Sequence, residues 1–257
     1  MAALKRQPAF IAEPAPSAPT FSRNGLAYRE LHQRLDALRT PCFWPAVAGK
    51  PRLTSAERAG LVRLVGAIPG AAGEEEMLAA IEAMRHAPAG DVVQIGAGWG
   101  RSAALYAWLA RRYGVGKTLC IDAWEGESPG DGDEALRIFE INLAPLAQGD
   151  VNYIRAASAD AAMAYGPSPS VTTEAFGTTT YEGRIAVLCL SGAVAEPQAA
   201  ADCALWTPRV IPAGWIMFGN CEGGAGRRVA EAFVGANLAR IAARFEAGSA
   251  LFVQLKR

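Results

Sequence analysis

The chain has 257 residues, of which 51% are hydrophobic and 19% charged, with 25 basic and 25 acidic side chains. A chain of this length and composition can bury a substantial core, as one large α/β domain or two small ones, and is not disordered as a whole. The balanced charge argues against binding that depends on neutralising phosphates, so we expect neither nucleic acid nor a membrane surface as a partner.

The number and positions of the histidines and cysteines exclude several kinds of metal and catalytic site. The two histidines, His32 and His86, both lie in the first third of the chain. This placement excludes a histidine-rich metal site and a Ser-His-Asp triad in the second half. The five cysteines form no CxxC pair, and Cys120, Cys189 and Cys203 lie in apolar runs. Small core thiols of this kind are typical of reduced cysteines, so we predict a cytoplasmic location.

The N-terminal stretch, residues 1–20, is rich in proline and alanine. It contains no continuous apolar run of the roughly 7–15 residues that a signal peptide needs. No window of the chain approaches the roughly 18–20 apolar residues of a membrane span. We therefore expect a flexible tail rather than an export signal or an anchor.

Residues 21–88 are expected to form an N-terminal helical segment or lid. Within it, Phe43 and Trp44 lie between two prolines, and they suit a lid over the site and the filling of a core edge equally well. The spacing of leucines, N-cap residues and turn residues predicts helices over Phe21 to about Arg39, Thr54 or Ser55 to Ile68, and Glu74 to His86.

From residue 89 onward, short apolar runs alternate with helical patterns. Strands separated by helices of this length imply parallel crossovers. We therefore predict an α/β fold over residues 89–257, with a doubly wound, Rossmann-like and mostly parallel sheet. The predicted strands are Asp91–Ile95, Lys117–Asp122, Val151–Arg155, Ile185–Leu190 and Gly214–Phe218, with later segments near Ala239–Phe245 and Ala250–Leu255. The predicted helices are Arg101–Arg112, Asp133 to about Leu143, Ser158–Ala164, Glu196–Trp206 and Gly226–Asn237.

One connection, Gly166 to Gly183, is long for a sheet of this kind. Connections of this length are typically either functional loops or mobile segments, and both alternatives stay open here.

The most informative segment joins the first predicted strand to its helix. Gly96, Gly98 and Gly100 stand at alternate positions, where they suit a tight turn, a close ligand approach and a free helix N-terminus. A dinucleotide fingerprint requires G-x-G-x-x-G, and Arg101 stands where its third glycine would be. The spacing favours a ligand with a carboxylate-bearing end over a pyrophosphate.

An acidic residue ends the second predicted strand. Asp122 is placed to accept hydrogen bonds from both hydroxyls of a ribose, and Trp124 could then cover a purine. The structural alternative is an ordinary strand-end aspartate followed by a core tryptophan.

The chain resembles the class I S-adenosylmethionine-dependent methyltransferases, and most closely the macrocin O-methyltransferase-like branch, which acts on sugars and small hydroxylated metabolites. The resemblance spans roughly Thr54 to Leu255 and lies in the order and spacing of GDVVQIGAGWGRSA, TLCIDAWEG, AADCALWTPRVIPAGWIMFGN and GRRVAEAF. It implies S-adenosylmethionine as the cofactor. By this resemblance, the methionine end would lie against Gly96, Ala97, Gly98 and Gly100, the ribose against Asp122, and the adenine against Ala123, Trp124, Ala157 and Ser158.

Three departures from the family's pattern bear on catalysis. Gln94 stands where the first motif usually has an acid. The metal-dependent members carry carboxylates and a histidine after the fourth and fifth strands of their sheet, where this chain has Ser191 and Asn220. Because Mg²⁺ needs oxygen ligands with carboxylate charge, we expect no metal. Ser191 and Asn220 remain candidate catalytic residues that could position a substrate hydroxyl.

No catalytic base is identified from the sequence. Asp202 and Trp206 lie one turn apart on a predicted helix, a spacing that favours packing over catalysis.

Three hypotheses follow. The first is a methyltransferase that acts without metal on a hydroxyl, or an amine, of a small metabolite or sugar. The second is a catalytically degenerate protein of the same fold that binds a ligand or a partner, which the loss of the acid at Gln94 and of the metal ligands supports. The third, an NAD-dependent oxidoreductase, is disfavoured by Arg101. The expected partner is a small-molecule acceptor, and a homodimer is compatible with the sequence.

Overall fold

The computed structural model describes residues 49–125, 132–192, 195–221 and 224–257. The tail predicted at 1–20, the helix predicted at Phe21–Arg39 and the Phe43-Trp44 segment lie outside the described residues. None of the helices in the described ranges is both long enough and apolar enough to span a membrane.

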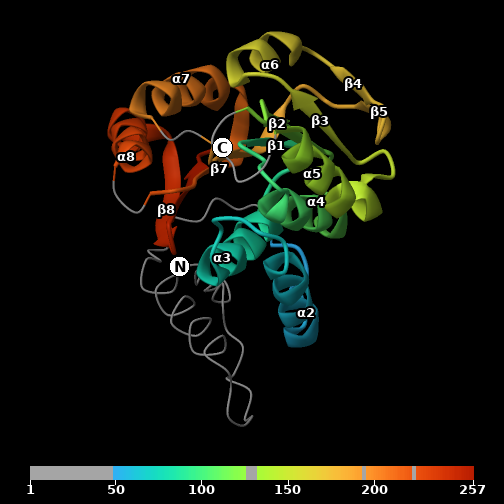
Figure 1. The fold of residues 1–257 in the computed structure, drawn as a ribbon. Helices are drawn as coiled ribbons and strands as arrows, with labels where there is room; N and C mark the ends of the chain where they lie inside the picture. The colour runs from blue at the N-terminus through green and yellow to red at the C-terminus, as the bar shows by residue number, and fades with distance from the viewer. Residues whose placement is uncertain (1–48, 126–131, 193–194, 222–223) are drawn as a thin grey trace.

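Within these ranges the centre of the molecule is a seven-stranded sheet (Figure 1). Its strands are β1 (Asp91–Ile95), β2 (Thr118–Asp122), β3 (Val151–Arg155), β6 (Ile185–Leu190), β7 (Val210–Phe218), β8 (Ile241–Ala247) and β9 (Ala250–Leu255). They lie in the order β3-β2-β1-β6-β7-β9-β8. The pairs from β3 to β7 are parallel, and β9 runs antiparallel to both β7 and β8. The predicted mostly parallel α/β fold is therefore confirmed.

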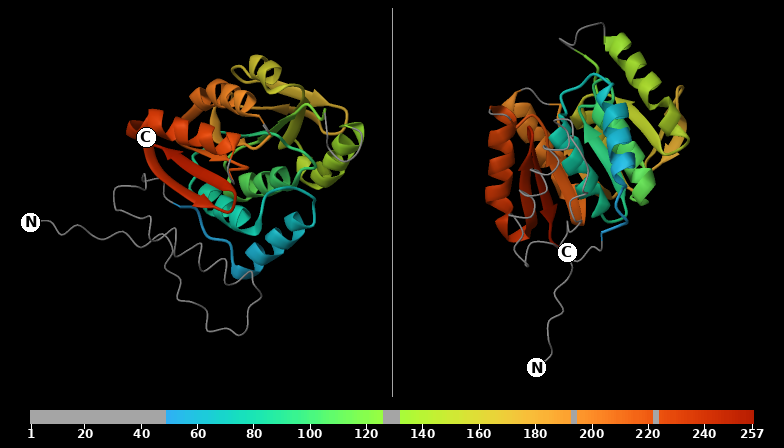
Figure 2. Two further views of the ribbon diagram at one scale, coloured as in Figure 1. Left: turned by 60° about the vertical axis from the view of Figure 1, so that its left-hand side comes forward. Right: turned by 90° about the horizontal axis from the view of Figure 1, so that it is seen from below.

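Helices cover both faces of the sheet (Figure 2). Because side chains alternate along a strand, Val92 packs with the helices of one face and Val93 with those of the other. The first face carries α2 (Ser55–Gly66), α3 (Glu74–Arg85), α4 (Arg101–Tyr113) and α5 (Gly132–Ala147). The second carries α6 (Ser158–Ala164), α7 (Glu196–Trp206) and α8 (Ala225–Asn237).

The described N-terminal helices share the core of the sheet. Helix α2 begins with a capping box in which Thr54 and Glu57 bond each other's backbone amides. Leu61 of α2 and Met84 of α3 belong to the same buried cluster as Val92 of β1. The guanidinium of Arg101, the first residue of α4, ties α4 to the end of α2 and the segment after it, since it donates to the carbonyls of Gly66, Ile68 and Ala72.

The long connection at 166–183 contains an ordered hairpin, made of β4 (Ser170–Thr173) and β5 (Gly177–Thr180). It packs beside β3, the outer strand of the sheet (Figure 1). Buried Asn152 of β3 holds it, because its amide donates to the carbonyls of Val171 at 3.0 Å and Gly177 at 2.9 Å. The hairpin thus protects a strand edge that would otherwise be open to pairing.

Two elements are longer than predicted. Helix α5 continues to Ala147 through Pro145, and β7 begins at Val210 rather than at Gly214. Elsewhere the predicted elements of residues 54–257 agree with the observed ones to within about three residues, the scale on which assignments differ at element ends.

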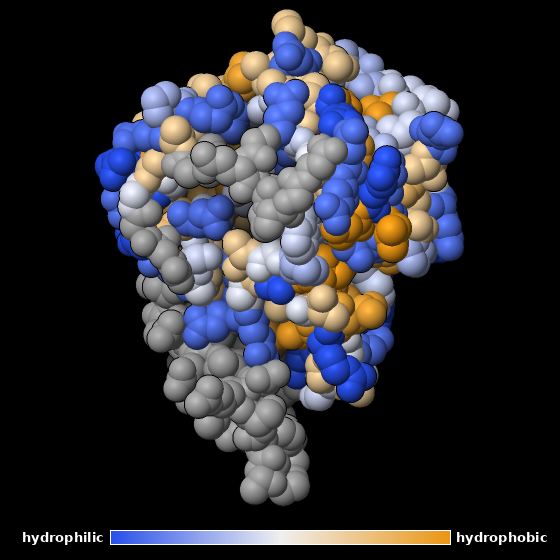
Figure 3. Space-filling model, viewed as in Figure 1, coloured by the Kyte–Doolittle hydropathy of each residue, from blue (hydrophilic) through white to orange (hydrophobic). Residues whose placement is uncertain are grey.

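Apolar side chains gather on the outer surface of α2, α4 and α5 (Figure 3). On these helices Leu64 is 67% exposed and Ile141 is 72% exposed. The homodimer stays a prediction, and this exposed apolar face is a surface through which two copies can pack.

Replacing Asn152 by alanine is expected to lower the free energy of unfolding by about 2–3 kcal/mol, because buried polar groups left without a partner cost about 1–3 kcal/mol each. For a domain of this size, that loss corresponds to a fall in Tm of roughly 4–12 °C in a thermal melt. Thr172→Ala, on the exposed side of the hairpin, is the matched control. An equal effect of the two changes would contradict the anchoring role of Asn152.

Candidate functional site

The site lies at the carboxyl ends of the parallel strands. The chain passes from β1 to β2 and β3 on one side and then returns to β6 and β7 on the other, so the strand order reverses between β1 and β6. In open α/β sheets, ligands bind in the crevice at this point of reversal. All but one of the candidate cofactor and catalytic residues predicted from the sequence lie in the segments that follow β1, β2, β3, β6 and β7, and Asp122 is the last residue of β2.

The three glycines of the turn after β1 differ in what lies next to them. All three have positive φ. A Cβ on Gly96 would lie 2.2 Å from the Cα of Gly192, so Gly96 permits the ends of β1 and β6 to meet. A Cβ on Gly100 would lie 2.5 Å from a methyl of Leu143 in α5. Only Gly98 of the three faces open space, with no heavy atom within 4 Å of an added Cβ.

The carboxylate of Asp122 is bonded to this turn. Its Oδ2 accepts from the amides of Ala97 at 2.9 Å and Gly98 at 2.8 Å, and its Oδ1 accepts from the amide of Trp124 at 2.8 Å. An ionised carboxylate has about four acceptor positions, so one position on Oδ1 is left for a ligand. The two turn amides already have an internal partner, and the preference for a ligand carboxylate inferred from the spacing finds no support at these amides.

Trp124 contacts the turn after β1 through its indole ring. Its φ of 48° is unusual for a bulky residue, and its indole N–H donates to the carbonyl of Gly98 at 2.9 Å. The residue is 5% exposed, and its ring packs against Phe139 and Tyr153, with centroids 5.0 and 5.5 Å away. This packing favours the core tryptophan considered above over a ring that covers a purine. Trp124 holds both Gly98 and Asp122 in place.

The remaining residues expected beside the adenine lie near Asp122. Ala123 is half-buried and Ala157 is exposed, one strand over at the end of β3. Ser158 is buried, and its hydroxyl accepts a hydrogen bond of 2.8 Å from the indole of Trp206. Ala157 therefore offers an accessible surface, while Ser158 links α6 to α7.

The two candidate catalytic residues are brought together at the ends of β6 and β7. The Asn220 side-chain amide donates to the Ser191 carbonyl at 2.9 Å. The Ser191 hydroxyl lies 3.2 Å from the carbonyl of Ile95 and 3.1 Å from that of Gly96, and it donates to them. Its hydrogen is thus used within the fold, and its oxygen, to which the Cys189 thiol donates at 4.0 Å, has one lone pair left for another donor.

Gln94 takes a role that an acid could not take. Its amide nitrogen donates to the carbonyl of Gly96 at 2.9 Å, and a carboxylate has no hydrogen to give there. The side chain is 1% exposed, and its Oε1 has no partner among the described residues. Gln94 therefore stabilises the turn and leaves one buried acceptor beneath it.

The thiol of Cys189, near the end of β6, is not a nucleophile. Burial raises the pKa of Cys189 to about 12, although its bond to the hydroxyl of Tyr106 favours the thiolate. A thiol with this pKa is protonated at neutral pH and unreactive. Burial also raises the pKa of the Tyr106 hydroxyl well above its usual value. All four described cysteines are buried and free.

A small hollow of about 20 Å³, roughly the room of one water molecule, lies beside the turn between α7 and α8. Asp202 of α7 forms part of its wall and is 4% exposed, in agreement with the packing role that the sequence spacing favoured. The hollow is lined by Leu190, Ser191, Gly192, Ala199, Asp202, Phe218, Gly219, Gly226 and Val229. Across the described part of the chain, no three or more His, Cys, Asp or Glu side chains form a group that could hold a metal ion.

Comparison with known proteins agrees with this architecture. The chain belongs to a family of methyltransferase domains, whose sequence model matches residues 93–221, just over half of the chain. The O-methyltransferase NovP shares 14% identity, with a TM-score of 0.53 over 91% of this chain and 100% of NovP. A candidate caffeoyl-CoA O-methyltransferase from Staphylococcus aureus shares 12% identity, with a TM-score of 0.50 over 80% of this chain and 93% of its own. No curated protein matches the chain in sequence.

Asp122→Ala is expected to loosen the turn even without a ligand, because three amides lose their acceptor. We expect the free energy of unfolding to fall by about 1–3 kcal/mol, the cost of leaving partly buried donors unpaired. Hydrogen exchange should accelerate at the amides of Ala97 and Gly98. Asp160→Ala, at an exposed position of α6, should change stability by less than about 1 kcal/mol. Unchanged exchange at the turn in Asp122→Ala would show that the carboxylate does not hold it.

Proposed function

We propose that this protein transfers a methyl group from S-adenosylmethionine to a hydroxyl, or an amine, of a small metabolite or sugar, and that it does so without a metal ion. The observation that carries the proposal is the network of Asp122, Trp124 and the turn after β1, which lies at the strand reversal beneath open space at Gly98. Membership of the methyltransferase family supports the reaction class. NovP is an O-methyltransferase, but at 14% identity it supports the fold alone, so oxygen as the acceptor atom rests on our proposal.

The residues around the turn fit such a cofactor. Its sulfonium would supply an activated methyl group. A nucleoside hydroxyl can bond the remaining position on Oδ1 of Asp122. The open space at Gly98 permits close approach to the backbone, and Ala123 and Ala157 offer small side chains beside it. The chain's contribution here is to bind and orient, since Asp122 and Trp124 fix the turn before the ligand arrives.

Orientation of the acceptor is the second task of the site. Methyl transfer needs an in-line approach, and holding the reactants in the right geometry can supply much of the rate. Ser191 lies directly after β6 and can accept a hydrogen bond from an acceptor hydroxyl. Asn220 fixes the backbone of Ser191, which makes it a positioning residue in this proposal.

Metal independence rests on the donor set at the ends of β6 and β7. Ser191 and Asn220 are neutral, and Asn220 already donates its amide to a carbonyl. Hard divalent cations bind oxygen ligands that carry carboxylate charge.

Because Ser191 and Asn220 are neutral, we expect that adding Mg²⁺ alone does not raise the Tm of the protein. Addition of excess EDTA should also leave both the affinity for S-adenosylhomocysteine and any methyl transfer unchanged. A chelator-sensitive activity, restored by Mg²⁺, would contradict this part of the proposal.

A second candidate is a protein of this fold that binds its ligand without catalysis. It is favoured by Gln94 in place of an acid and by the turn amides that bond to Asp122. Binding of S-adenosylhomocysteine, together with no transfer of labelled methyl to a panel of hydroxyl- and amine-bearing acceptors, would support it.

Isothermal titration with S-adenosylhomocysteine tests the cofactor. We expect Asp122→Ala to weaken binding by about 1.5–3 kcal/mol, the scale of charge-assisted hydrogen bonds, which is roughly a 10- to 150-fold rise in Kd. Asp160→Ala should bind as the unaltered chain does, and NAD should bind neither protein. Equal affinities of Asp122→Ala and the unaltered chain would remove Asp122 from the site.

A further inference from the structure

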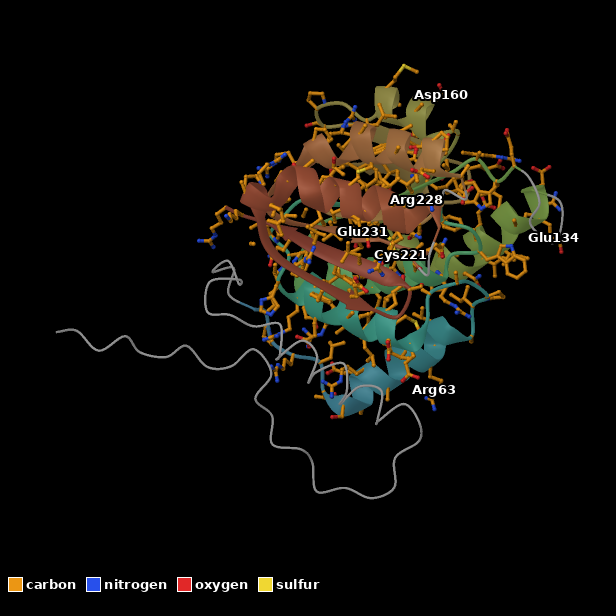
Figure 4. The ribbon with its side chains drawn as sticks, turned by 90° about the vertical axis from the view of Figure 1, so that its left-hand side faces the viewer. Arg63, Glu134, Asp160, Cys221, Arg228 and Glu231 are labelled. Atoms are coloured by element: carbon orange, nitrogen blue, oxygen red, sulfur yellow. The ribbon has the colours of Figure 1, made fainter. Side chains whose placement is uncertain are left out.

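The turn between β8 and β9, which contains Gly248 and Ser249, lies at the same end of the sheet as the candidate site. Strand β9 pairs antiparallel with β7, and Leu251 near its start lies opposite Phe218 at the end of β7. The segment after β7 is bonded to this turn, because the backbone amide of Cys221 donates to the carbonyl of Ser249. Figure 4 shows Cys221 below α8 and beside the hairpin of β8 and β9. The turn therefore borders the candidate catalytic residue that precedes Cys221.

This residue, Asn220, is held from two sides. Its φ of 54° lies in the left-handed region, which asparagine adopts more readily than most residues. Its side-chain amide donates to the carbonyl of Ser191 at 2.9 Å, and the peptide N–H that follows it, that of Cys221, donates to the carbonyl of Ser249. Asn220 is exposed, and its Oδ1 accepts no hydrogen bond from the described residues. This oxygen is therefore available to a hydrogen-bond donor of a ligand.

Glu76 anchors the turn between β8 and β9 to α3. Its Oε2 accepts a hydrogen bond of 3.1 Å from the hydroxyl of Ser249, and the residue is 6% exposed. Glu76 is the third residue of α3, where the positive end of the helix dipole stabilises a carboxylate. The contact is close, since a Cβ added to Gly248 would lie 3.5 Å from the backbone nitrogen of Glu76.

The charge of Glu76 acts on residues next to both candidate catalytic residues. Cys189 lies two residues before Ser191, and Cys221 directly follows Asn220. Burial is the main cause of the raised pKa of the Cys189 thiol, and the negative charge of Glu76 raises this pKa further. Burial also raises the pKa of Cys221, and the charge of Glu76 again adds to the effect. Glu76 therefore lies within electrostatic reach of the ends of β6 and β7.

We propose that Glu76 is a positioning residue for the methyl acceptor. Through Ser249, it holds the backbone of Asn220 in the left-handed conformation that leaves Oδ1 next to Ser191 as a partner for the acceptor hydroxyl. Methyl transfer depends on such alignment, because small displacements of a reactant lower the rate strongly. The inference rests on the proposed methyltransferase function for the identity of the ligand as an acceptor. The effect of Glu76 on Asn220 can be tested without any ligand.

Nuclear magnetic resonance of the full chain measures this effect. The side-chain amide of Asn220, identified by its absence from the spectrum of Asn220→Ala, reports on the bond to Ser191, and hydrogen exchange at Cys221 reports on the bond to Ser249. In Glu76→Ala and Ser249→Ala we expect shifted Asn220 resonances and exchange at Cys221 that is faster by about tenfold or more, the scale of one charge-assisted hydrogen bond. Glu76→Gln keeps an oxygen for the Ser249 hydroxyl and should restore both properties.

Glu75→Ala is the matched control. It removes the neighbouring bond between α3 and the same turn, in which the amide of Gly248 donates to Glu75 at 3.0 Å. This change should leave the Asn220 resonances in place, and a thermal melt checks that each variant folds. An equal effect of Glu75→Ala and Glu76→Ala would show a general loosening of the turn and overturn the inference. Unchanged exchange at Cys221 in Glu76→Ala would overturn it as well.

Two further measurements connect the position of Asn220 to the proposed reaction. Glu76→Ala should bind S-adenosylhomocysteine as the unaltered chain does, because that ligand is expected at Asp122. Its kcat/KM for a methyl acceptor should fall by about tenfold or more and recover in Glu76→Gln. Undiminished transfer in Glu76→Ala would overturn the positioning role. Failure of the unaltered chain to bind S-adenosylhomocysteine would overturn the methyltransferase proposal, while exchange at Cys221 would still decide whether Glu76 holds Asn220.

Discussion

The site depends on one carboxylate, that of Asp122, which bonds the turn at the end of the neighbouring strand. Three backbone amides converge on its two oxygens, and two of them belong to the turn after β1. Trp124 completes the network. Its backbone amide donates to the carboxylate of Asp122, and its indole N–H donates to the carbonyl of Gly98. The positive φ of Trp124 is a strained conformation that these bonds and its aromatic packing maintain. The turn is therefore shaped by the protein itself rather than by a ligand.

Much of the fold could be predicted because the spacing of apolar residues along the sequence indicates which side chains are buried. The run IAVLCL is buried at every position, as the central strand of a two-sided sheet requires, and Thr54 with Glu57 marks the start of α2. The hairpin at 170–180 could not be predicted, because its position depends on Asn152, about 20 residues earlier in β3. A polar side chain in a strand gives no local sign of the distant carbonyls that it bonds.

The same limit applies within the site. The sequence indicates that an acid ends β2, but not that two amides 24 and 25 residues before it are its partners. The spacing predicts a tight turn at Gly96 and a free helix N-terminus at Gly100, but not that both glycines make room for the protein's own chain, at Gly192 and at Leu143. Glycine permits close approach in general, and only the tertiary structure decides what approaches.

Two of the residues at which we expected departures from the family's pattern, Gln94 and Ser191, meet at the carbonyl of Gly96. Gln94 and Ser191 both donate to this oxygen, at 2.9 and 3.1 Å, and thereby use its two lone pairs. An acid in place of Gln94 would set an ionised oxygen against the carbonyl. Both side chains therefore stabilise the contact between the ends of β1 and β6.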